Sequence, residues 1–332
     1  MRAFEYTRVD TIDQAITLLD HAPDHLGQGG TRALAGGTDL LTLIKAEVST
    51  PIHLVDIKRL SELPRGIVAT ENGLSIGALT TLSEIEKSQL LRSQYPILAE
   101  AAAVAATPQL RNMATIGGNL LQRPRCWYFR NQHFACWLKG GEGCPAQAGE
   151  NQQHALFSNG ACYAVHPSDL AAALVALAAT VRLRGAQGER TLPLHEFFAL
   201  PEDHRRRETT IADDELLLSI DLPSLPADTH STYLKAMDRK VWAFALVGVA
   251  AVLQVTDGQV TAARIVLSGV APIPWRVRAA EQALIGASLP DTALLERVAT
   301  IALAEAMPLA QNQYKVPLAK QLIQRALRTL IA

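Results

Sequence analysis

The sequence predicts a mixed fold of helices and strands in two domains, residues 1–226 and 227–332. Two observations predict it. Segments with helical and strand periodicity alternate along the first part, whereas the second part begins with long strands and ends in helices. A polar, proline-containing stretch, LPADT at 225–229, separates the two parts and is typical of a linker.

The first 60 residues carry the pattern of a βα unit. In segment 11–22 the apolar residues recur at the spacing of one helix face, and Thr11 or Asp10 can cap the start of that helix. Segment 51–60 follows with strand-like residues. We therefore expect a strand, a helix and a second strand to open the fold.

The rest of the first domain is predicted from turns and helix boundaries. Segment 66–88 contains two short alternating strands joined by a Glu-Asn-Gly turn, which indicates a hairpin. An alanine-rich helix follows in segment 95–107 and stops before Pro108, because the residue that precedes a proline avoids helical geometry. Segment 170–184 predicts a buried helix that runs into a strand, and 190–198 and 213–223 are expected to add further strands.

The second domain is predicted to start with strands and to end with helices. Segment 230–237 is strand-like, and 244–271 has the pattern of a hairpin whose turn is Asp257-Gly258. Two helical stretches follow it. The hairpin turn is the clearest local signal in the chain.

Composition and charge restrict the function classes. The 332 residues are 48% hydrophobic, which is enough for a large core, and 31 basic against 32 acidic residues give a net charge of -1. No overall field would attract nucleic acid or an anionic membrane. No apolar run is long enough to cross a bilayer, and the N-terminal segment lacks the apolar region of a signal peptide. We expect no membrane insertion, and export only if another chain carries this one.

The phrase LAGGTDLL, at 34–41, has the composition of a phosphate-binding loop. Gly36 and Gly37 have no Cβ atoms, so their amides can approach a phosphate, and Thr38 adds a hydroxyl donor before a helix begins. A tight strand-to-helix turn that binds nothing explains the same residues equally well. The spacing is neither GxGxxG nor that of a Walker A motif.

A second phrase, ATPQLRNMATIGGNLL at 106–121, repeats this chemistry. It supplies Thr107, Thr115, Gly118 and Asn119, which are small or hydrogen-bonding groups around a glycine pair. Two such loops in one domain suit a dinucleotide that lies between them. One loop would hold the diphosphate and the other the far end of the molecule.

All four cysteines lie between this second phrase and residue 166: Cys126, Cys136, Cys144 and Cys162, with nine, seven and seventeen residues between them. Their confinement argues for one shared site. Two disulfides, a tetrahedral zinc ion and a 4Fe-4S cluster are the alternatives.

The spacing of the cysteines favours the iron-sulfur cluster. Four-cysteine zinc sites usually contain two short CxxC knuckles, and this sequence has none. A 4Fe-4S cluster takes one thiolate per iron, so widely spaced cysteines in a long loop suit it. Nearby aromatic residues can shield such a cluster, or can simply form a small core that lets the loop fold: Trp127, Phe129, Phe134 and Trp137. His133, His154 and His166 also lie near, and we assign them no role from sequence.

Together, the two glycine phrases resemble the FAD-binding subunit of the molybdenum hydroxylases, the family of xanthine dehydrogenase and aldehyde oxidoreductase. The likeness covers essentially the whole chain. It continues through HPSDL at 166–170, ELLLSIDLP at 215–223, YLKAMDR at 233–239 and LSGVAPIPWRVRAAEQAL at 267–284.

The resemblance implies a fold and an FAD site. The fold is α+β: a two-lobed FAD-binding domain of the vanillyl-alcohol oxidase (PCMH) type, then a smaller C-terminal domain of the CO dehydrogenase flavoprotein type. Arg32 to Leu40 would wrap the diphosphate. Asp169 would bind the ribose or adenine side, unless it only opens a helix, and Lys235 would approach the flavin, unless it is an ordinary strand lysine. The implied FAD site is Arg32, Ala33, Leu34, Ala35, Gly36, Gly37, Thr38, Asp39, Leu40, Ala106, Thr107, Ala114, Thr115, Gly118, Asn119, Leu121, Asp169 and Lys235.

The long cysteine loop, about 122–166, refines the resemblance. Such an insertion is similar to two subgroups, the flavoprotein subunits of bacterial periplasmic aldehyde oxidoreductase and of 4-hydroxybenzoyl-CoA reductase. The segments QRPRCWYF and ACYAVHPSD look closer to the aldehyde oxidoreductase. The resemblance thus implies FAD and a 4Fe-4S cluster on the four cysteines.

The same resemblance implies partner subunits. A large subunit would oxidise an aldehyde at a molybdenum cofactor, and a small subunit with two 2Fe-2S clusters would pass electrons to FAD on this chain, which hands them to an external acceptor. The chain itself has no motif for the molybdenum cofactor. The complex would be a periplasmic heterotrimer exported by a signal on the small subunit, with the cytoplasm as the alternative.

Two other function classes compete. A scaffold subunit could hold zinc on the cysteines and carry vestigial glycine loops, and an independent flavin oxidase could meet its substrate directly. The visible spectrum of the pure protein discriminates between these classes.

Overall fold

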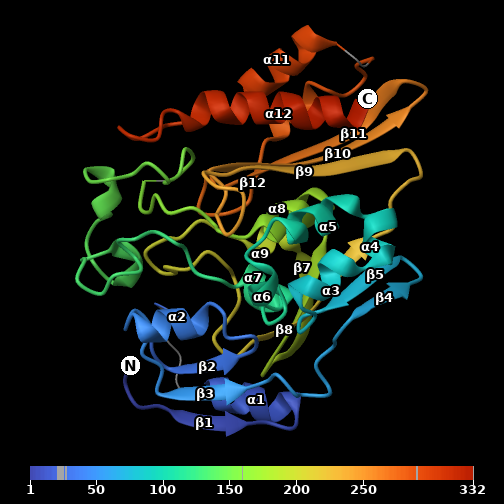
Figure 1. Cartoon of the computed structure of the whole chain (residues 1–332). Helices are drawn as coiled ribbons and strands as arrows, with labels where there is room; N and C mark the ends of the chain where they lie inside the picture. The colour runs from blue at the N-terminus through green and yellow to red at the C-terminus, as the bar shows by residue number, and fades with distance from the viewer. Residues whose placement is uncertain (21–25, 27, 159, 289–290, 332) are drawn as a thin grey trace.

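The computed structural model describes residues 1–20, 26, 28–158, 160–288 and 291–331. Three sheets follow one another from the N-terminus to the C-terminus in Figure 1. The two sheets of the N-terminal part form two lobes, and the third sheet belongs to the C-terminal part. This order positions the glycine phrases between the first two sheets.

The first lobe is a small parallel sheet with helices. Its strand order is β1-β3-β2, with β1 pairing parallel to β3 and β2 pairing parallel to β3. The expected βα opening is confirmed, and Thr11 accepts a hydrogen bond from the Gln14 amide at the start of the first helix. The elements are β1 (Glu5–Arg8), α1 (Ile12–Asp20), β2 (Thr31–Leu34), α2 (Leu40–Lys45) and β3 (His53–Asp56).

The second lobe is an antiparallel sheet in the order β4-β5-β8-β6-β7, covered by short helices. The expected hairpin at 66–88 is confirmed as β4 and β5, and the alanine-rich helix ends before Pro108. The strands are β4 (Ile67–Thr70), β5 (Gly73–Gly77), β6 (Thr180–Gly185), β7 (Gly188–Pro193) and β8 (Leu216–Pro223). The helices are α3 (Leu82–Lys87), α4 (Gln89–Gln94), α5 (Pro96–Ala103), α6 (Pro108–Arg111), α7 (Ile116–Leu120), α8 (Asp169–Ala176) and α9 (Leu194–Phe197).

Helix α9 corrects one expectation. The whole of segment 190–198 was expected to be strand, but the strand β7 ends at Pro193 and a helical turn follows. Leu194 and Phe197 are both fully buried. Their spacing of three residues puts both side chains on one side of a helical turn, so packing into the core decides the conformation.

The third sheet has the order β12-β11-β10-β9 and is covered on both faces. In Figure 1 α11 and α12 lie above it, and α5 and α8 lie below it. Alternate residues of β10 point to the two faces: Val249 and Ala251 pack in the core of the C-terminal helices, and Ala250 and Val252 in the core of α5 and α8. The elements are β9 (Thr229–Ala236), β10 (Val247–Thr256), β11 (Gln259–Ser268), β12 (Trp275–Arg276), α10 (Arg278–Gln282), α11 (Thr292–Ala302) and α12 (Lys315–Ile331).

The C-terminal part therefore shares a core with the second lobe. The domain boundary that we predict at residue 226 falls between β8 and β9, and it stays a prediction. The expected hairpin turn is confirmed: Asp257 and Gly258 have φ angles of 51° and 76°, the left-handed geometry that such a two-residue turn requires.

The cysteine loop, 122–166, carries little regular structure. Among its described residues there are only two short 3₁₀ turns, Trp137–Lys139 and Pro145–Gln147. In Figure 1 it lies at one side of the molecule, drawn in green, between the first lobe and the C-terminal sheet. In the described part of the chain, no helix is both long and apolar enough to span a membrane.

Candidate functional site

A cavity of about 270 Å³ lies where the two glycine phrases meet. Its wall combines the loop after β2, the start of α7, the beginning of the cysteine loop and the segment 207–217. Of the predicted FAD residues, the following line it: Arg32, Ala33, Ala35, Gly36, Gly37, Thr38, Asp39, Leu40, Thr115, Gly118 and Leu121. The structure therefore brings together two phrases that lie some eighty residues apart in sequence.

The first glycine phrase offers backbone donors to this cavity. Within the described residues, the amides of Gly36, Gly37, Thr38 and Asp39 donate no hydrogen bond to the protein. Consecutive unpaired amides in a loop form a concave site that suits the oxygen atoms of an anion. The composition of the phrase and its geometry therefore both indicate an anion-binding loop.

Glycine at position 36 is required for the contact between the phrases. A Cβ atom there would lie 1.9 Å from the carbonyl oxygen of Met113 in the second phrase. The sequence interpretation credited both glycines with access for a phosphate. The structure shows that Gly36 lets two backbones approach each other, whereas Gly37 has a φ angle of 71° and would crowd Leu34 and Leu41 if it carried a side chain.

The second phrase uses its hydroxyl to fix a helix. Thr115 is the N-cap of α7, and its Oγ1 accepts a hydrogen bond of 3.2 Å from the Gly118 amide. The Gly117 amide donates to the carbonyl of Ala78 at the end of the neighbouring strand. The cap and the strand contact hold Thr115 and Gly118 at the cavity wall.

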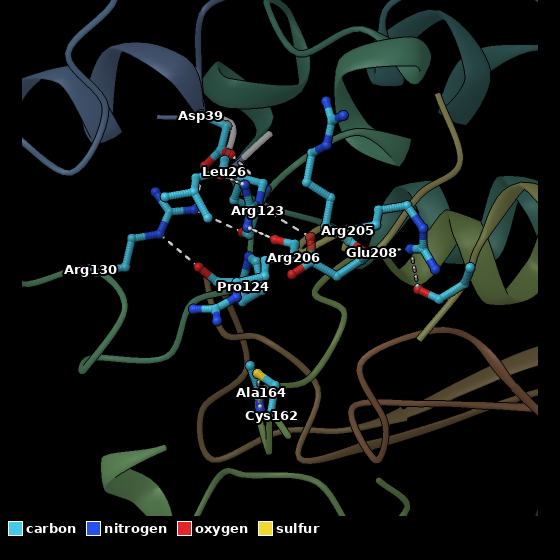
Figure 2. A network of polar contacts seen from close by, with 12 residues as sticks. Leu26, Asp39, Arg123, Pro124, Arg130, Cys162, Ala164, Arg205, Arg206 and Glu208 are labelled. Carbon is cyan, nitrogen blue, oxygen red and sulfur yellow. Dashed lines mark hydrogen bonds and ion pairs between the residues drawn. The ribbon is translucent and has the colours of Figure 1, made fainter. Parts of the chain in front are cut away.

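A partly buried charged network closes one side of the cavity. Asp39 pairs with Arg125 at 2.5 Å and Arg130 at 2.7 Å, and it accepts the backbone amide of Arg123 at 2.9 Å. Figure 2 shows Asp39, Arg123 and Arg130 of this network. Burial opposes ionisation of Asp39, but the two arginines prevail and lower its pKa below the usual value. Burial, in turn, lowers the pKa of Arg130 to about 10.

Arg123 connects this network to a segment far along the chain. Its guanidinium pairs with Glu208 at 3.2 Å and donates to the carbonyls of Leu26 and Arg206. Burial raises the pKa of Glu208, and Arg123 opposes that rise. Arg206 donates to the carbonyls of Trp137 and Gly141 in the cysteine loop. The cavity wall and the cysteine loop are thus one connected structure.

Sequence reasoning missed several of these residues. Gln122, Arg123, Arg207, Glu208 and Asp213 line the cavity, and Arg207 pairs with Asp213 at 2.5 Å. The run of arginines at 205–207 followed by Glu208 gave no usable signal, since a charged run usually lies in solvent, whereas here the arginines are half-buried and Glu208 is buried.

Other predicted FAD residues lie away from the cavity wall. Leu34 and Ala114 are buried in hydrophobic clusters. Thr107 caps α6, and the Ala106 carbonyl accepts from Arg111. The side chain of Asn119 accepts a hydrogen bond from Ser168. Their roles toward FAD stay predictions.

Asp169 and Lys235, which we predict to contact FAD, form a buried ion pair. Lys235 Nζ lies 2.8 Å from Asp169 Oδ2, and the two side chains are 2% and 5% exposed. The Tyr233 hydroxyl donates to Asp169 Oδ1 at 2.6 Å, and Lys235 also donates to the Val104 carbonyl at 3.0 Å. Burial raises the pKa of Asp169, while Lys235 and Tyr233 favour its ionised form. Lys235 is not a solvent-facing strand lysine.

The four cysteines are free thiols that lie close enough to interact. The structure contains no disulfide among them. Cys126, Cys136 and Cys162 share one hydrophobic cluster, and Cys144 interacts electrostatically with all three. The disulfide alternative is therefore wrong for this structure.

Burial and backbone amides surround the cysteine sulfur atoms. Burial raises the pKa of Cys126 to about 12 and that of Cys162 well above its usual value. Nearby backbone amides oppose this rise, and the Ala164 amide donates a hydrogen bond of 3.4 Å to the sulfur of Cys162. Amides aimed at sulfur are the environment of a metal-bound thiolate. Of the four nearby aromatic residues, Phe129 and Trp137 are buried beside the sulfurs.

Two protein families match this chain, one over each of its two parts. The family described as "FAD binding domain in molybdopterin dehydrogenase" matches residues 2–225, and "CO dehydrogenase flavoprotein C-terminal domain" matches residues 232–330. The aldehyde oxidoreductase FAD-binding subunit PaoB of Escherichia coli (strain K12) is 38% identical over 330 residues, 98% of each chain. The glyceraldehyde dehydrogenase medium chain of Sulfolobus acidocaldarius is 28% identical over 87% of this chain and 83% of its own.

A solved structure agrees with the fold. A chain of the carbon monoxide dehydrogenase from Hydrogenophaga pseudoflava superimposes with a TM-score of 0.78 at 28% identity, covering 99% of this chain and 97% of that one. The α+β fold that the resemblance implied is confirmed. On these grounds the chain belongs to the FAD-binding subunits of the molybdenum hydroxylase family.

Proposed function

We propose that this chain is the FAD-binding, electron-transferring subunit of a molybdenum-containing aldehyde oxidoreductase. The observation that carries the proposal is the cavity between the two glycine phrases, in a chain of this family. The similarity to PaoB supports the aldehyde as the substrate class of the complex. No motif for the molybdenum cofactor was found in the sequence, so hydroxylation belongs to a partner subunit.

The cavity residues fit FAD. The unpaired amides of Gly36, Gly37 and Thr38 would hold the diphosphate, and Thr115 and Gly118 would hold the opposite side of the molecule. The network around Asp39 orients the start of the cysteine loop against this site. When bound, FAD supplies the step that collects single electrons and releases them in pairs. The protein supplies position and polarity.

The four cysteines fit a 4Fe-4S cluster better than one zinc ion. Thiolates about 2.3 Å from one zinc lie only about 3.8 Å apart. Among the described residues, no three Cys, His, Asp or Glu side chains converge as ligands of a single ion. Cys126, Cys136 and Cys162 nevertheless share one hydrophobic cluster, Cys144 contributes to the raised pKa of each of them, and the Ala164 amide donates to the sulfur of Cys162. We infer that Cys126, Cys136, Cys144 and Cys162 each bind one iron.

The FAD assignment is tested by flavin content. Gly37→Val forces a branched residue into a φ angle of 71° against Leu34 and Leu41, which distorts the phrase that faces the cavity. Gly286→Val is the matched control, since Gly286 has a φ angle of 78° and no atom within 4 Å of a Cβ. We expect flavin per chain to fall severely in the first variant only. Full flavin in Gly37→Val would reject the diphosphate site.

The cluster assignment is tested by iron and sulfide analysis. We expect about four iron and four sulfide per wild-type chain. Cys136→Ser should lose much of both and keep its flavin content, because the cavity lies outside the cluster formed by the cysteines. Gln132→Ser, an exposed change in the same loop, controls for loop damage. One zinc per wild-type chain, with no iron, would contradict the assignment.

The partners are tested by purification of the complex. We propose a heterotrimer with a large molybdenum-cofactor subunit and a small subunit that carries two 2Fe-2S clusters, in the periplasm. Co-expression of the three chains should yield one complex in the periplasmic fraction that reduces its bound flavin with an aldehyde. A complex found in the cytoplasm alone would reject the location, and reduction by aldehyde without the large subunit would reject the division of labour.

A further inference from the structure

His154 contacts one of the proposed cluster ligands directly. Its Nε2 atom lies 3.2 Å from the sulfur of Cys126, and the side chain is 2% exposed. From sequence alone this histidine had no role. The contact joins residues that lie 28 positions apart, so tertiary packing creates it.

The imidazole of His154 is held in place from several sides. Trp127 packs edge-on against the ring, with centroids 4.9 Å apart and planes at 82°. The backbone carbonyl of His154 accepts hydrogen bonds from Asn312 at 3.1 Å and from Lys315 at 2.9 Å. Both donors belong to the C-terminal part, so the position of the ring does not depend on the cysteine loop alone.

The protonation state of an iron-bound cysteine determines which ring nitrogen of His154 carries the proton. A thiolate bound to iron has no proton, so it can only accept a hydrogen bond, and the ring atom that faces it must be a donor. The other ring nitrogen, Nδ1, is buried and has no hydrogen-bond partner among the described residues. His154 also lines a small cavity of about 40 Å³, a volume sufficient for water that can satisfy Nδ1.

We propose that His154 donates its Nε2 proton to the Cys126 sulfur and thereby raises the reduction potential of the cluster. This inference rests on the proposed four-cysteine cluster. Hydrogen bonds to ligand sulfur tune the potential of iron-sulfur centres, because they stabilise the more negative, reduced form. His154 is a positioning and tuning residue in this role, since it acts through Cys126.

The test is an EPR-monitored redox titration of the purified complex. His154→Phe keeps a ring in the same space and removes the donor, and His154→Gln keeps a donor. We expect the midpoint potential of the cluster to be lower in His154→Phe than in the wild type. A tenfold change in the reduction equilibrium corresponds to a shift of about 59 mV for one electron. His154→Gln should recover part of the shift. His133→Phe, an exposed change in the same loop, should leave the potential unchanged.

The outcomes separate the two proposals. An unchanged potential in His154→Phe with full iron content would overturn the tuning role and leave the cluster assignment intact. A wild-type protein without four-iron centres would overturn the proposed cluster itself. If His154→Phe loses its iron, pulsed EPR of the reduced wild type tests the hydrogen bond instead. Selective isotopic labelling of histidine nitrogen should change the weak nitrogen coupling in the spectrum. An unchanged spectrum would reject the hydrogen bond.

Discussion

Replacing Lys235 with methionine should destabilise the protein strongly, because it leaves the Asp169 carboxylate buried without its partner. The two side chains are 2% and 5% exposed, and their charged atoms are 2.8 Å apart. Removing one member of a buried pair typically costs about 3–5 kcal/mol. Methionine is only one atom shorter than lysine, so lost packing contributes little.

The proton equilibrium of Asp169 gives an independent estimate. A buried carboxyl that loses its cation escapes the cost by taking up a proton. Starting from the usual pKa of 3.8, protonation at pH 7 costs about 4 kcal/mol, at 1.36 kcal/mol per pH unit. At pH 5 the same step costs about 2 kcal/mol. The folded variant then holds a proton that the unfolded chain lacks, so its stability rises as the pH falls.

Urea denaturation of the flavin-free protein at pH 7 and pH 5 measures this effect. Lys235→Met should lose about 4 kcal/mol relative to wild type at pH 7 and about half of that at pH 5. The double variant with Asp169→Asn should recover most of the loss, because no buried charge remains. A loss below about 1 kcal/mol at pH 7, with no pH dependence, would refute the reasoning. Normal stability together with lost flavin would instead make Lys235 a direct FAD contact.

Three further predictions address the cavity and the C-terminal part. Gly36→Ala places a Cβ atom 1.9 Å from the Met113 carbonyl, so it should separate the glycine phrases and lower the flavin content. In the control, Gly143→Ala, the added Cβ atom meets no atom within 4 Å, and the flavin content should not fall. Equal flavin content in both variants would contradict this prediction. Thr115→Ala removes the cap of α7 and should cost about 1 kcal/mol in urea denaturation, with Thr115→Ser as the control that keeps the cap. Burial lowers the pKa of Lys315 from 10.5 to about 7. Between these two pH values the unfolded chain binds more protons than the folded one, so the free energy of unfolding should rise as the pH increases. Lys315→Met should flatten that rise.

The sequence by itself determined the local features of this protein. The Asp257-Gly258 turn, the cap of the first helix by Thr11 and the alternation of apolar residues depend on neighbouring residues, so they were predictable from short segments. The two glycine phrases and the confinement of the four cysteines were also visible, and they led to the family. Segment 190–198 shows the limit, because its last half became a helix through burial of Leu194 and Phe197.

Only the tertiary structure decided which side chains meet. Asp39 and Arg123 are 84 residues apart, and the pair of Asp169 with Lys235 spans 66 residues. No local pattern contains the partner of such a residue, since burial of charge is stabilised only when packing brings the opposite charge to it. For the same reason the sequence could place His154 near the cysteines, but only the packed chain points its ring at the sulfur of Cys126.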